Sequence, residues 1–217
     1  MKPTKEYNGR SQIRMYNCDC MELLESGKRW DLAIVDPPYG LNIPICETGK
    51  WKRKIHDKNK GWDTKTPIKK YFDTLFSVSE NQIVWGANHF ISKMPFDSSC
   101  WIFYDKKNGT NFMSDGEMAY TSFNTRVRRY AYNHIQDYNR GIERIHPTQK
   151  PVQLYKWLLT NYAKEGDTIF DSHGGSMSIA IACWDLGFDL DICELDTDYF
   201  NDAVKRFENH ISQTQLF

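Results

Sequence analysis

Four consecutive residues, Asp36-Pro37-Pro38-Tyr39, combine a carboxylate, two rigid backbone positions and an aromatic ring. They follow residues 32–35, a short apolar run that predicts a buried strand. Proline cannot donate a backbone hydrogen bond, so the strand must end there, and the carbonyls of Asp36 and Pro37 can accept hydrogen bonds from a ligand. The Asp36 carboxylate adds two acceptor oxygens, and Tyr39 adds a flat face for stacking. The stretch therefore predicts a pocket for a planar ring that carries an exocyclic amino group.

A second candidate site begins at Asp171, where a predicted strand leads into Ser172-His173-Gly174-Gly175-Ser176 and then a helix. Paired glycines let backbone amides approach a ligand with no Cβ in the way. The next predicted strand ends at Glu194, at close to the spacing of ~20 residues expected for a carboxylate that binds ribose hydroxyls. The Gly-x-Gly-x-x-Gly fingerprint is absent, but the arrangement as a whole indicates a nucleoside-binding unit.

Two segments are rich in basic residues. Between Lys50 and Lys70 there are nine basic and two acidic residues, and the segment 126–144 interleaves arginines with aromatic residues. Guanidinium groups contact phosphates or base edges, and aromatic rings can fill the gap that a displaced base leaves. Both segments are predicted to contact nucleic acid, with solvated surface loops as the alternative. The candidate contact residues are Lys52, Arg53, Lys54, Arg126, Arg128, Arg129 and Arg140.

The composition of the 217-residue chain limits its class. Formal net charge is zero, so attraction to nucleic acid must come from local clusters of charge. The six cysteines form no Cys-x-x-Cys pair and the six histidines are scattered, so neither a disulfide framework nor a metal site is expected. No apolar run approaches the ~20 residues that span a bilayer, which favours a cytoplasmic protein.

Strands and helices are predicted to alternate along most of the chain, which indicates an α/β fold. Helical spacing of apolar residues separates several of the strands. The strands are predicted at residues 12–16, 32–35, 83–85, 101–104, 117–123, 168–171 and 188–193.

The order of the motifs resembles the β-class of S-adenosylmethionine-dependent DNA amino-methyltransferases. Asp-Pro-Pro-Tyr comes first, then the arginine-rich segment, then His-Pro-Thr-Gln-Lys-Pro at 146–151, then the glycine-rich loop. The resemblance implies a circularly permuted Rossmann-like fold, with a mostly parallel seven-stranded sheet and helices on both faces. It also implies one domain over 1–217, a basic loop at about 41–66 and a target-recognition segment at about 124–145. Double-stranded DNA is the implied partner, in bacterial or phage restriction-modification. The short recognition segment argues for a short site or a homodimer.

The same resemblance assigns residues to the cofactor, S-adenosylmethionine. Its methionine portion is expected on Asp171, Gly175 and Ser176, with Ser172, His173 and Gly174 completing the loop and Asp36 adjoining it. Its other implied contacts are Glu194 for the ribose, Lys150 or Thr148 for the carboxylate and Asp19 for the adenine. Met177 stands where the family commonly has glycine, and its side chain must enter either the core or the cofactor pocket.

The implied reaction is methylation of the N6 amino group of adenine in DNA, with Asp36, Pro37, Pro38 and Tyr39 as the catalytic residues. N4-cytosine methylation is the nearest alternative, although those enzymes more often begin the motif with serine. Protein glutamine methyltransferases normally begin it with asparagine and place the cofactor loop first. The remaining alternative is a DNA-binding module of the same fold without activity.

Overall fold

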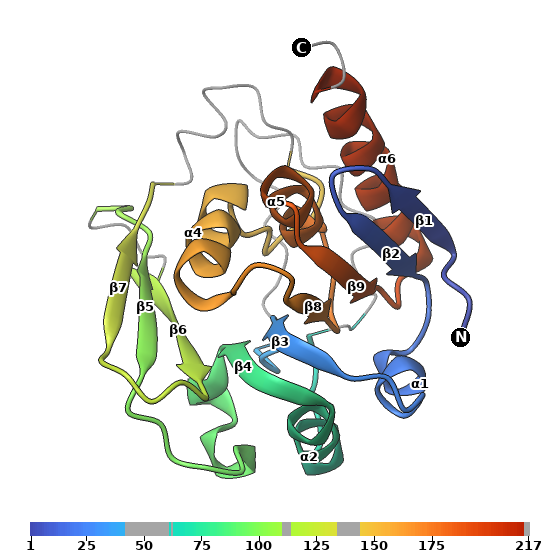
Figure 1. The fold of residues 1–217 in the computed structure, drawn as a ribbon. Coiled ribbons are helices and arrows are strands. Elements are labelled where there is room, and N and C mark those ends of the chain that lie inside the picture. Colours follow the sequence, from blue (N-terminus) through green and yellow to red (C-terminus); the bar gives the residue numbers. More distant parts are fainter. Residues whose placement is uncertain (42–60, 62, 110–113, 134–143, 215–217) are drawn as a thin grey trace.

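A mixed nine-stranded sheet forms the centre of the molecule (Figure 1). The computed structural model describes residues 1–41, 61, 63–109, 114–133 and 144–214. Within that part, the strands are β1 (Lys5–Asn8), β2 (Gln12–Tyr16), β3 (Trp30–Val35), β4 (Ser79–Trp85), β5 (Trp101–Asp105), β6 (Gly116–Thr121), β7 (Arg128–Ala131), β8 (Thr168–Asp171) and β9 (Asp189–Cys193). The helices are α1 (Cys20–Leu24), α2 (Lys69–Val78), α4 (Val152–Tyr162), α5 (Ser178–Leu186) and α6 (Thr197–Thr214), with 3₁₀ turns η1 (Ala87–His89) and η2 (Ile91–Lys93).

The strand order is β1-β2-β9-β8-β3-β4-β6-β5-β7. Neighbours from β2 to β4 run parallel, β5 and β7 are also parallel, and the pairs β1/β2, β4/β6 and β6/β5 are antiparallel. The predicted α/β class is confirmed, and all seven predicted strands are present. The count of seven is corrected to nine in the described part of the chain, because β1 and β7 add a strand at each edge. Both are short and mostly polar, so neither shows the apolar alternation of a half-buried strand.

Helices cover both faces of the sheet, as predicted. Strand β3 shows why, since its buried residues alternate between two cores. Leu32 and Ile34 pack with residues of α4, α5 and α6, whereas Ala33 and Val35 pack with residues of α1 and α2. Full burial of one such aliphatic side chain contributes about 1.5–3 kcal/mol, so β3 is anchored from both sides.

The two predicted halves of the site meet because β8 pairs with β3. Leu32 lies opposite Ile169 and Ala33 opposite Phe170 in this parallel pair. The carboxyl ends of β3, β4, β8 and β9 therefore share one edge of the sheet, where open α/β sheets bind ligands. The half with β3 and β4 precedes the half with β8 and β9 along the chain, which is the permuted order that was expected.

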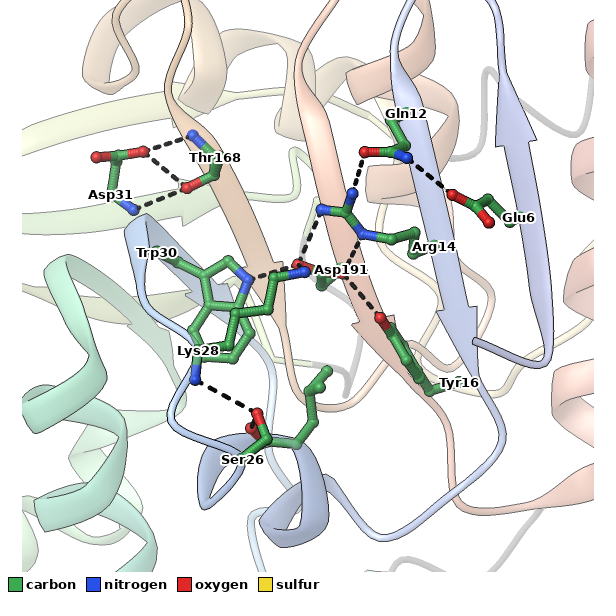
Figure 2. Close-up of polar contacts among 11 residues, drawn as sticks. Glu6, Gln12, Arg14, Tyr16, Ser26, Lys28, Trp30, Asp31, Thr168 and Asp191 are labelled. Carbon is green, nitrogen blue, oxygen red and sulfur yellow. Dashed lines mark hydrogen bonds and ion pairs between the residues drawn. The ribbon is translucent and has the colours of Figure 1, made fainter. Parts of the chain in front are cut away.

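A buried carboxylate, Asp191 on β9, links β9 to β2 and, across β8, to the start of β3 (Figure 2). It accepts hydrogen bonds from Arg14 Nε at 2.6 Å and Trp30 Nε1 at 2.7 Å, and Lys28 Nζ lies 2.6 Å away. Burial alone raises the pKa of Asp191, but these donors outweigh it and the pKa is lowered. Because removing one partner of a buried ion pair costs about 3–5 kcal/mol, this cluster is a structural anchor, and the sequence did not reveal it.

Among the described residues, no helix is both long enough and apolar enough to cross a membrane.

Candidate active site

Asp36 leaves the end of β3 and meets two buried donors. Lys150 Nζ lies 2.5 Å from Asp36 Oδ2, and the Tyr39 hydroxyl donates to Asp36 Oδ1 at 2.7 Å. Only 3% of the Lys150 side chain and 16% of the Asp36 side chain are exposed. The two prolines between Asp36 and Tyr39 end the strand, as predicted, and they turn the ring back toward the carboxylate.

Glu117, at the start of β6, completes this cluster. Its Oε2 lies 2.8 Å from Lys150 Nζ and accepts from the Tyr39 hydroxyl at 3.1 Å, while its Oε1 lies 2.7 Å from Lys106 Nζ. Sequence reasoning missed Glu117 as a site residue. The signal was present, because strand alternation places it on the same face as the buried Ala119.

Charges in the cluster balance, with two carboxylates and two ammonium groups. Burial raises the pKa of Asp36, the Lys150 ammonium opposes the rise, and the charge of Glu117 adds to it. Burial also acts to raise the pKa of Glu117, but its two lysine partners outweigh it and the pKa is lowered. For Lys150, burial lowers the pKa and the two carboxylates overcome that effect, so the pKa is raised. Lys150 is therefore charged, and Asp36 is the more basic carboxylate.

The Tyr39 ring is held in place by Gly86 and Asp63. A Cβ on Gly86 would overlap the ring, and Gly86 has φ +68°, so two independent constraints favour glycine there. Asp63 Oδ1 accepts from the backbone N–H groups of Tyr39 at 2.7 Å and Gly40 at 2.9 Å. The ring of His89 stacks on Tyr39, with centroids 5.1 Å apart and an interplanar angle of 15°.

The glycine-rich loop after β8 is fastened to the end of β9. The N–H of Gly174 donates to the Cys193 carbonyl at 2.7 Å, and the N–H of Gly175 donates to Glu194 Oε2 at 2.7 Å. A Cβ on Gly174 would lie 3.0 Å from Ile192 Cγ1, and Gly175 has φ +50°. The loop backbone and the Glu194 carboxylate therefore meet at the end of β9, and Glu194 helps to shape the loop.

Asp171 is a buried carboxylate at the base of this loop. Its Oδ1 accepts from the N–H of His173 at 3.0 Å. Burial raises the pKa of Asp171 to about 8, the His173 N–H opposes the rise, and the charges of Asp36 and Glu194 add to it. Burial raises the pKa of Glu194 as well. A cationic ligand beside the loop would favour the charged forms of both carboxyl groups.

Ser172 and His173 face the α2 side of the loop. The Ser172 hydroxyl lies 2.6 Å from the Tyr71 hydroxyl and 2.7 Å from His173 Nδ1. Burial lowers the pKa of His173 to about 4, so the imidazole is neutral at pH 7.

The segment 146–151 spans the two halves of the site. The position of a Cβ on Gly175 would be 3.5 Å from the His146 ring, and the Thr148 hydroxyl lies 3.1 Å from His146 Nδ1. Burial lowers the pKa of His146 to about 3. Lys150 then reaches Asp36 at the other end of the segment.

Asp19 and Ser176, assigned to the cofactor by resemblance, have structural partners of their own, and Met177 has a defined place in the core. Asp19 is exposed and caps α1 by accepting from the N–H of Met21 at 2.9 Å. The Ser176 hydroxyl lies 3.1 Å from the Ser178 hydroxyl. Met177 adopts left-handed angles, φ 51° and ψ 36°, and its fully buried side chain packs in the core with α5. The question left by the sequence is thereby answered, because the Met177 side chain enters the core.

The predicted DNA-contacting segments are only partly described. Residues 42–60, 62 and 134–143, which include Lys52, Arg53, Lys54 and Arg140, lie outside the described residues. Arg126 is exposed, and Arg128 and Arg129 belong to the edge strand β7. The Arg129 guanidinium pairs with Asp105.

The described residues contain no group of His, Cys, Asp or Glu side chains that could hold a metal ion.

Comparisons with known proteins identify related folds. Residues 100–205 match the family model described as DNA methylase, of the N6 and N4 type. The solved M1.HpyAVI–SAM complex superposes with a TM-score of 0.60 at 16% identity, covering 89% of this chain and 99% of that one. TTHA0409 from Thermus thermophilus gives a TM-score of 0.58 at 18% identity, covering 91% and 95%. The cytosine-N4-specific PvuII DNA methyltransferase gives 0.57 at 13% identity, covering 97% and 92%. No curated protein matches the chain by sequence.

Proposed function

We propose that this chain is a DNA amino-methyltransferase of the N6 and N4 type, as its match to the DNA methylase model over residues 100–205 supports, and that it methylates the N6 amino group of adenine in DNA. The observation that carries the proposal is the pairing of β3 with β8. It brings the acceptor group Asp36 and the glycine-rich loop after Asp171 to one edge of the sheet. Methyl transfer to an amine needs these two elements side by side, one for the amine and one for the methyl donor.

The residues of the loop fit S-adenosylmethionine as the methyl donor. Gly174 lets the loop backbone pack closely against β9, where a Cβ would meet Ile192 and Cys193, and Gly175 permits a positive φ. The loop backbone can therefore approach a ligand without a side chain in the way. Asp171 and Glu194, both with raised pKa values, suit a ligand with positively charged groups. Glu194 accepts hydrogen bonds from two backbone N–H groups and retains lone pairs that could accept from ribose hydroxyls. Thr148 is exposed beside the loop. When bound, S-adenosylmethionine supplies an electrophilic methyl group on a sulfonium.

Asp36 and its neighbours would prepare the target amine. The Asp36 carboxylate and the Pro37 carbonyl accept hydrogen bonds from the amino group, which draws the nitrogen lone pair out of conjugation with the ring. Tyr39 is locked against Gly86 and stacked on His89, so a base that has left the duplex would stack on the Tyr39 ring in place of His89. After transfer, the nitrogen must lose a proton. Asp36 suits that role because burial raises its pKa.

The Asp-Pro-Pro-Tyr form of the motif supports adenine over cytosine as the target. The similarity in fold to a cytosine-N4-specific enzyme keeps N4-cytosine methylation as the second candidate. A catalytically silent module is not favoured, because Met177 is buried in the core and does not overhang the loop.

Double-stranded DNA is the proposed partner, contacted by the segments at about 41–66 and 124–145 of a single domain. Arg126 and the β7 edge supply exposed positive charge on the described part of the second segment. A homodimer would extend this short recognition surface.

The experiment is direct. Purified protein is incubated with S-adenosylmethionine and unmethylated genomic DNA, and the DNA is digested and analysed by mass spectrometry of nucleosides. N6-methyldeoxyadenosine is expected, and long-read sequencing of the same DNA gives the recognised site. Detection of N4-methyldeoxycytidine instead would identify cytosine as the target base. Neither product, from folded protein that binds the cofactor, would overturn the proposal.

A further inference from the structure

Lys150 is shared between two carboxylates. Its Nζ lies 2.5 Å from Asp36 Oδ2 and 2.8 Å from Glu117 Oε2, and it also lies 3.2 Å from the Tyr39 hydroxyl. The side chain is almost fully buried, and its ammonium lies 5.2 Å from the centroid of the Trp85 ring. No other described lysine is paired with two carboxylates of this site.

This arrangement occupies the oxygens that the target amine needs. Each Asp36 oxygen already receives a hydrogen bond from a buried donor, Lys150 on one and Tyr39 on the other. A carboxylate paired with an ammonium is a weaker acceptor and a weaker base than one that is not. For Asp36 to act on an amine, Lys150 must give up Oδ2 at least in part.

A buried ammonium cannot simply be released. Leaving a charge buried without a partner costs several kcal/mol, more than a single hydrogen bond returns. Glu117 removes this difficulty, because it already contacts Lys150 and is itself ionised, with its pKa lowered by its two lysines. The Lys106 ammonium lies 2.7 Å from the other Glu117 oxygen, so the cluster holds two positive charges against the two carboxylates.

We propose that Glu117 is a positioning residue that takes over Lys150 when the target amino group binds Asp36. The inference rests on the proposed function, since it assigns a role in presenting the amine. In the ligand-free protein, the Lys150 contact keeps Asp36 neutralised. In the complex, the Glu117 carboxylate balances the charge of the Lys150 ammonium, so Asp36 Oδ2 can accept a hydrogen bond from the amine. The charge of Asp36 is therefore balanced by Lys150 in the ligand-free protein, and its carboxylate can accept from the amine once the base is bound.

Several charged or titratable groups face Asp36, and all bear on its titration. Lys150 comes from the segment 146–151, Glu117 from β6, and Tyr39 from the same loop as Asp36. Asp171 from β8 and Tyr155 from α4 lie within electrostatic range of Asp36. Of these groups, only Glu117 has a second described lysine partner, so Glu117 and Lys106 can be changed with opposite expected effects.

The first test measures the titration of the Asp36 carboxyl and does not depend on enzymatic activity. The protein is labelled with ¹³C at the aspartate side-chain carboxyl, the Asp36 resonance is assigned with Asp36→Asn, and its shift is followed with pH. Glu117→Gln should move the Asp36 midpoint to lower pH, because Lys150 then pairs with Asp36 alone and the negative neighbour is lost. Lys106→Met should move it to higher pH. Thermal unfolding of each variant verifies that it is folded.

The second test reads the reaction. Glu117→Gln should lower kcat/KM for DNA by roughly tenfold or more, which corresponds to loss of one charge-assisted contact of about 1.4 kcal/mol, and the acid limb of the pH profile should move with the Asp36 midpoint. Glu117→Asp, which restores a carboxylate, should recover part of the rate. A purely structural role predicts instead that rates follow thermal stability and that the pH profile does not move.

The outcomes separate the two proposals. If Glu117→Gln leaves the Asp36 midpoint unchanged, or leaves kcat/KM within twofold of wild type, the role of Glu117 is wrong. If the wild-type protein methylates no DNA at all, the proposed function fails, and that result is read from the wild type alone. A shifted midpoint together with a loss that Glu117→Asp partly rescues supports the inference.

Discussion

Asp36 and Asp171 leave neighbouring parallel strands at the same edge of the sheet, and the charge of Asp36 contributes to the raised pKa of Asp171. The two carboxylates belong to different motifs, one predicted to hold the amine and the other to hold the methyl donor. Because the two carboxyl groups interact electrostatically, neutralising the charge of one changes the pKa of the other.

The role of Asp36 predicts a separation between chemistry and cofactor binding. Asp36→Asn should lower the methylation rate by about 10²–10⁴-fold, because it removes the strongest acceptor and the proton acceptor while keeping the shape. S-adenosylmethionine affinity, measured by calorimetry, should change little. Wild-type rates from the purified variant would contradict the mechanism.

The pKa of Asp171 predicts pH-dependent cofactor binding. Below about 8 this carboxyl is mostly protonated, and a cationic ligand favours its charged form. Affinity for S-adenosylmethionine should therefore rise as pH increases from about 6 toward about 8, by at most tenfold per pH unit, and then level off. Titration calorimetry in buffers of different ionisation enthalpy should detect proton release on binding. Asp171→Asn is the control, since it should remove the component due to this group.

The same pKa fixes the sign of a stability effect. The pKa of Asp171 is about 8 in the folded state, compared with an ordinary value of 3.8 that applies to the unfolded chain. Between these two pH values the folded state therefore holds one proton that the unfolded state does not. Its contribution to the free energy of unfolding therefore falls as pH rises from about 4 to about 8. Asp171→Asn should accordingly raise the melting temperature more at pH 8 than at pH 5. An equal change at both pH values would mean that Asp171 titrates normally.

Gly86 is predicted to matter through the Tyr39 ring. Gly86→Ala places a methyl group where the ring lies, in addition to the strain at φ +68°, so methylation should fall by tenfold or more. Gly166→Ala is a matched control, because Gly166 has φ +86° but nothing within 4 Å of its Cβ position. Both variants should lose about 1–2 kcal/mol to strain, and only Gly86→Ala should also lose activity. Equal effects on activity would rule out the contact with Tyr39 as the cause.

Met177 allows strain and packing to be measured separately. Met177→Ala removes a fully buried side chain and keeps a left-handed residue, so it should cost about 2–5 kcal/mol. Met177→Gly removes the same side chain but relieves the strain, so it should be more stable than the alanine variant by about 1 kcal/mol. Chemical denaturation gives both values. A glycine variant less stable than the alanine variant would show that the left-handed angles carry no cost here.

The sequence predicted well those features that depend on local chemistry. The prolines after Asp36 end β3, the glycines after Asp171 form a loop, and the spacing to Glu194 places a carboxylate at that loop. It did not predict features set by packing between distant strands. Lys150 was assigned to the cofactor, yet in the structure it pairs with Asp36 and Glu117, which only the order of strands brings together.

The left-handed angles of Met177 were also beyond the sequence. Met is a good helix former, and nothing in its immediate neighbours indicates a positive φ. The core contacts of its side chain hold it there, at a cost that a glycine would not incur. Strand β7 escaped prediction for a similar reason, since its polar residues acquire strand geometry by pairing with β5.

The position of β8 has a consequence for how the chain folds during synthesis. Strands β2 and β3 are made early, but β9 and β8 lie between them in the sheet and are made last. The nascent chain therefore leaves the ribosome with two strand edges exposed, and the sheet cannot close until its carboxyl-terminal part has emerged. Long-range pairing of this kind slows folding and exposes edges on which chains aggregate. The Asp-Pro-Pro-Tyr motif after β3 is therefore synthesised well before β8, the strand that completes its edge of the sheet.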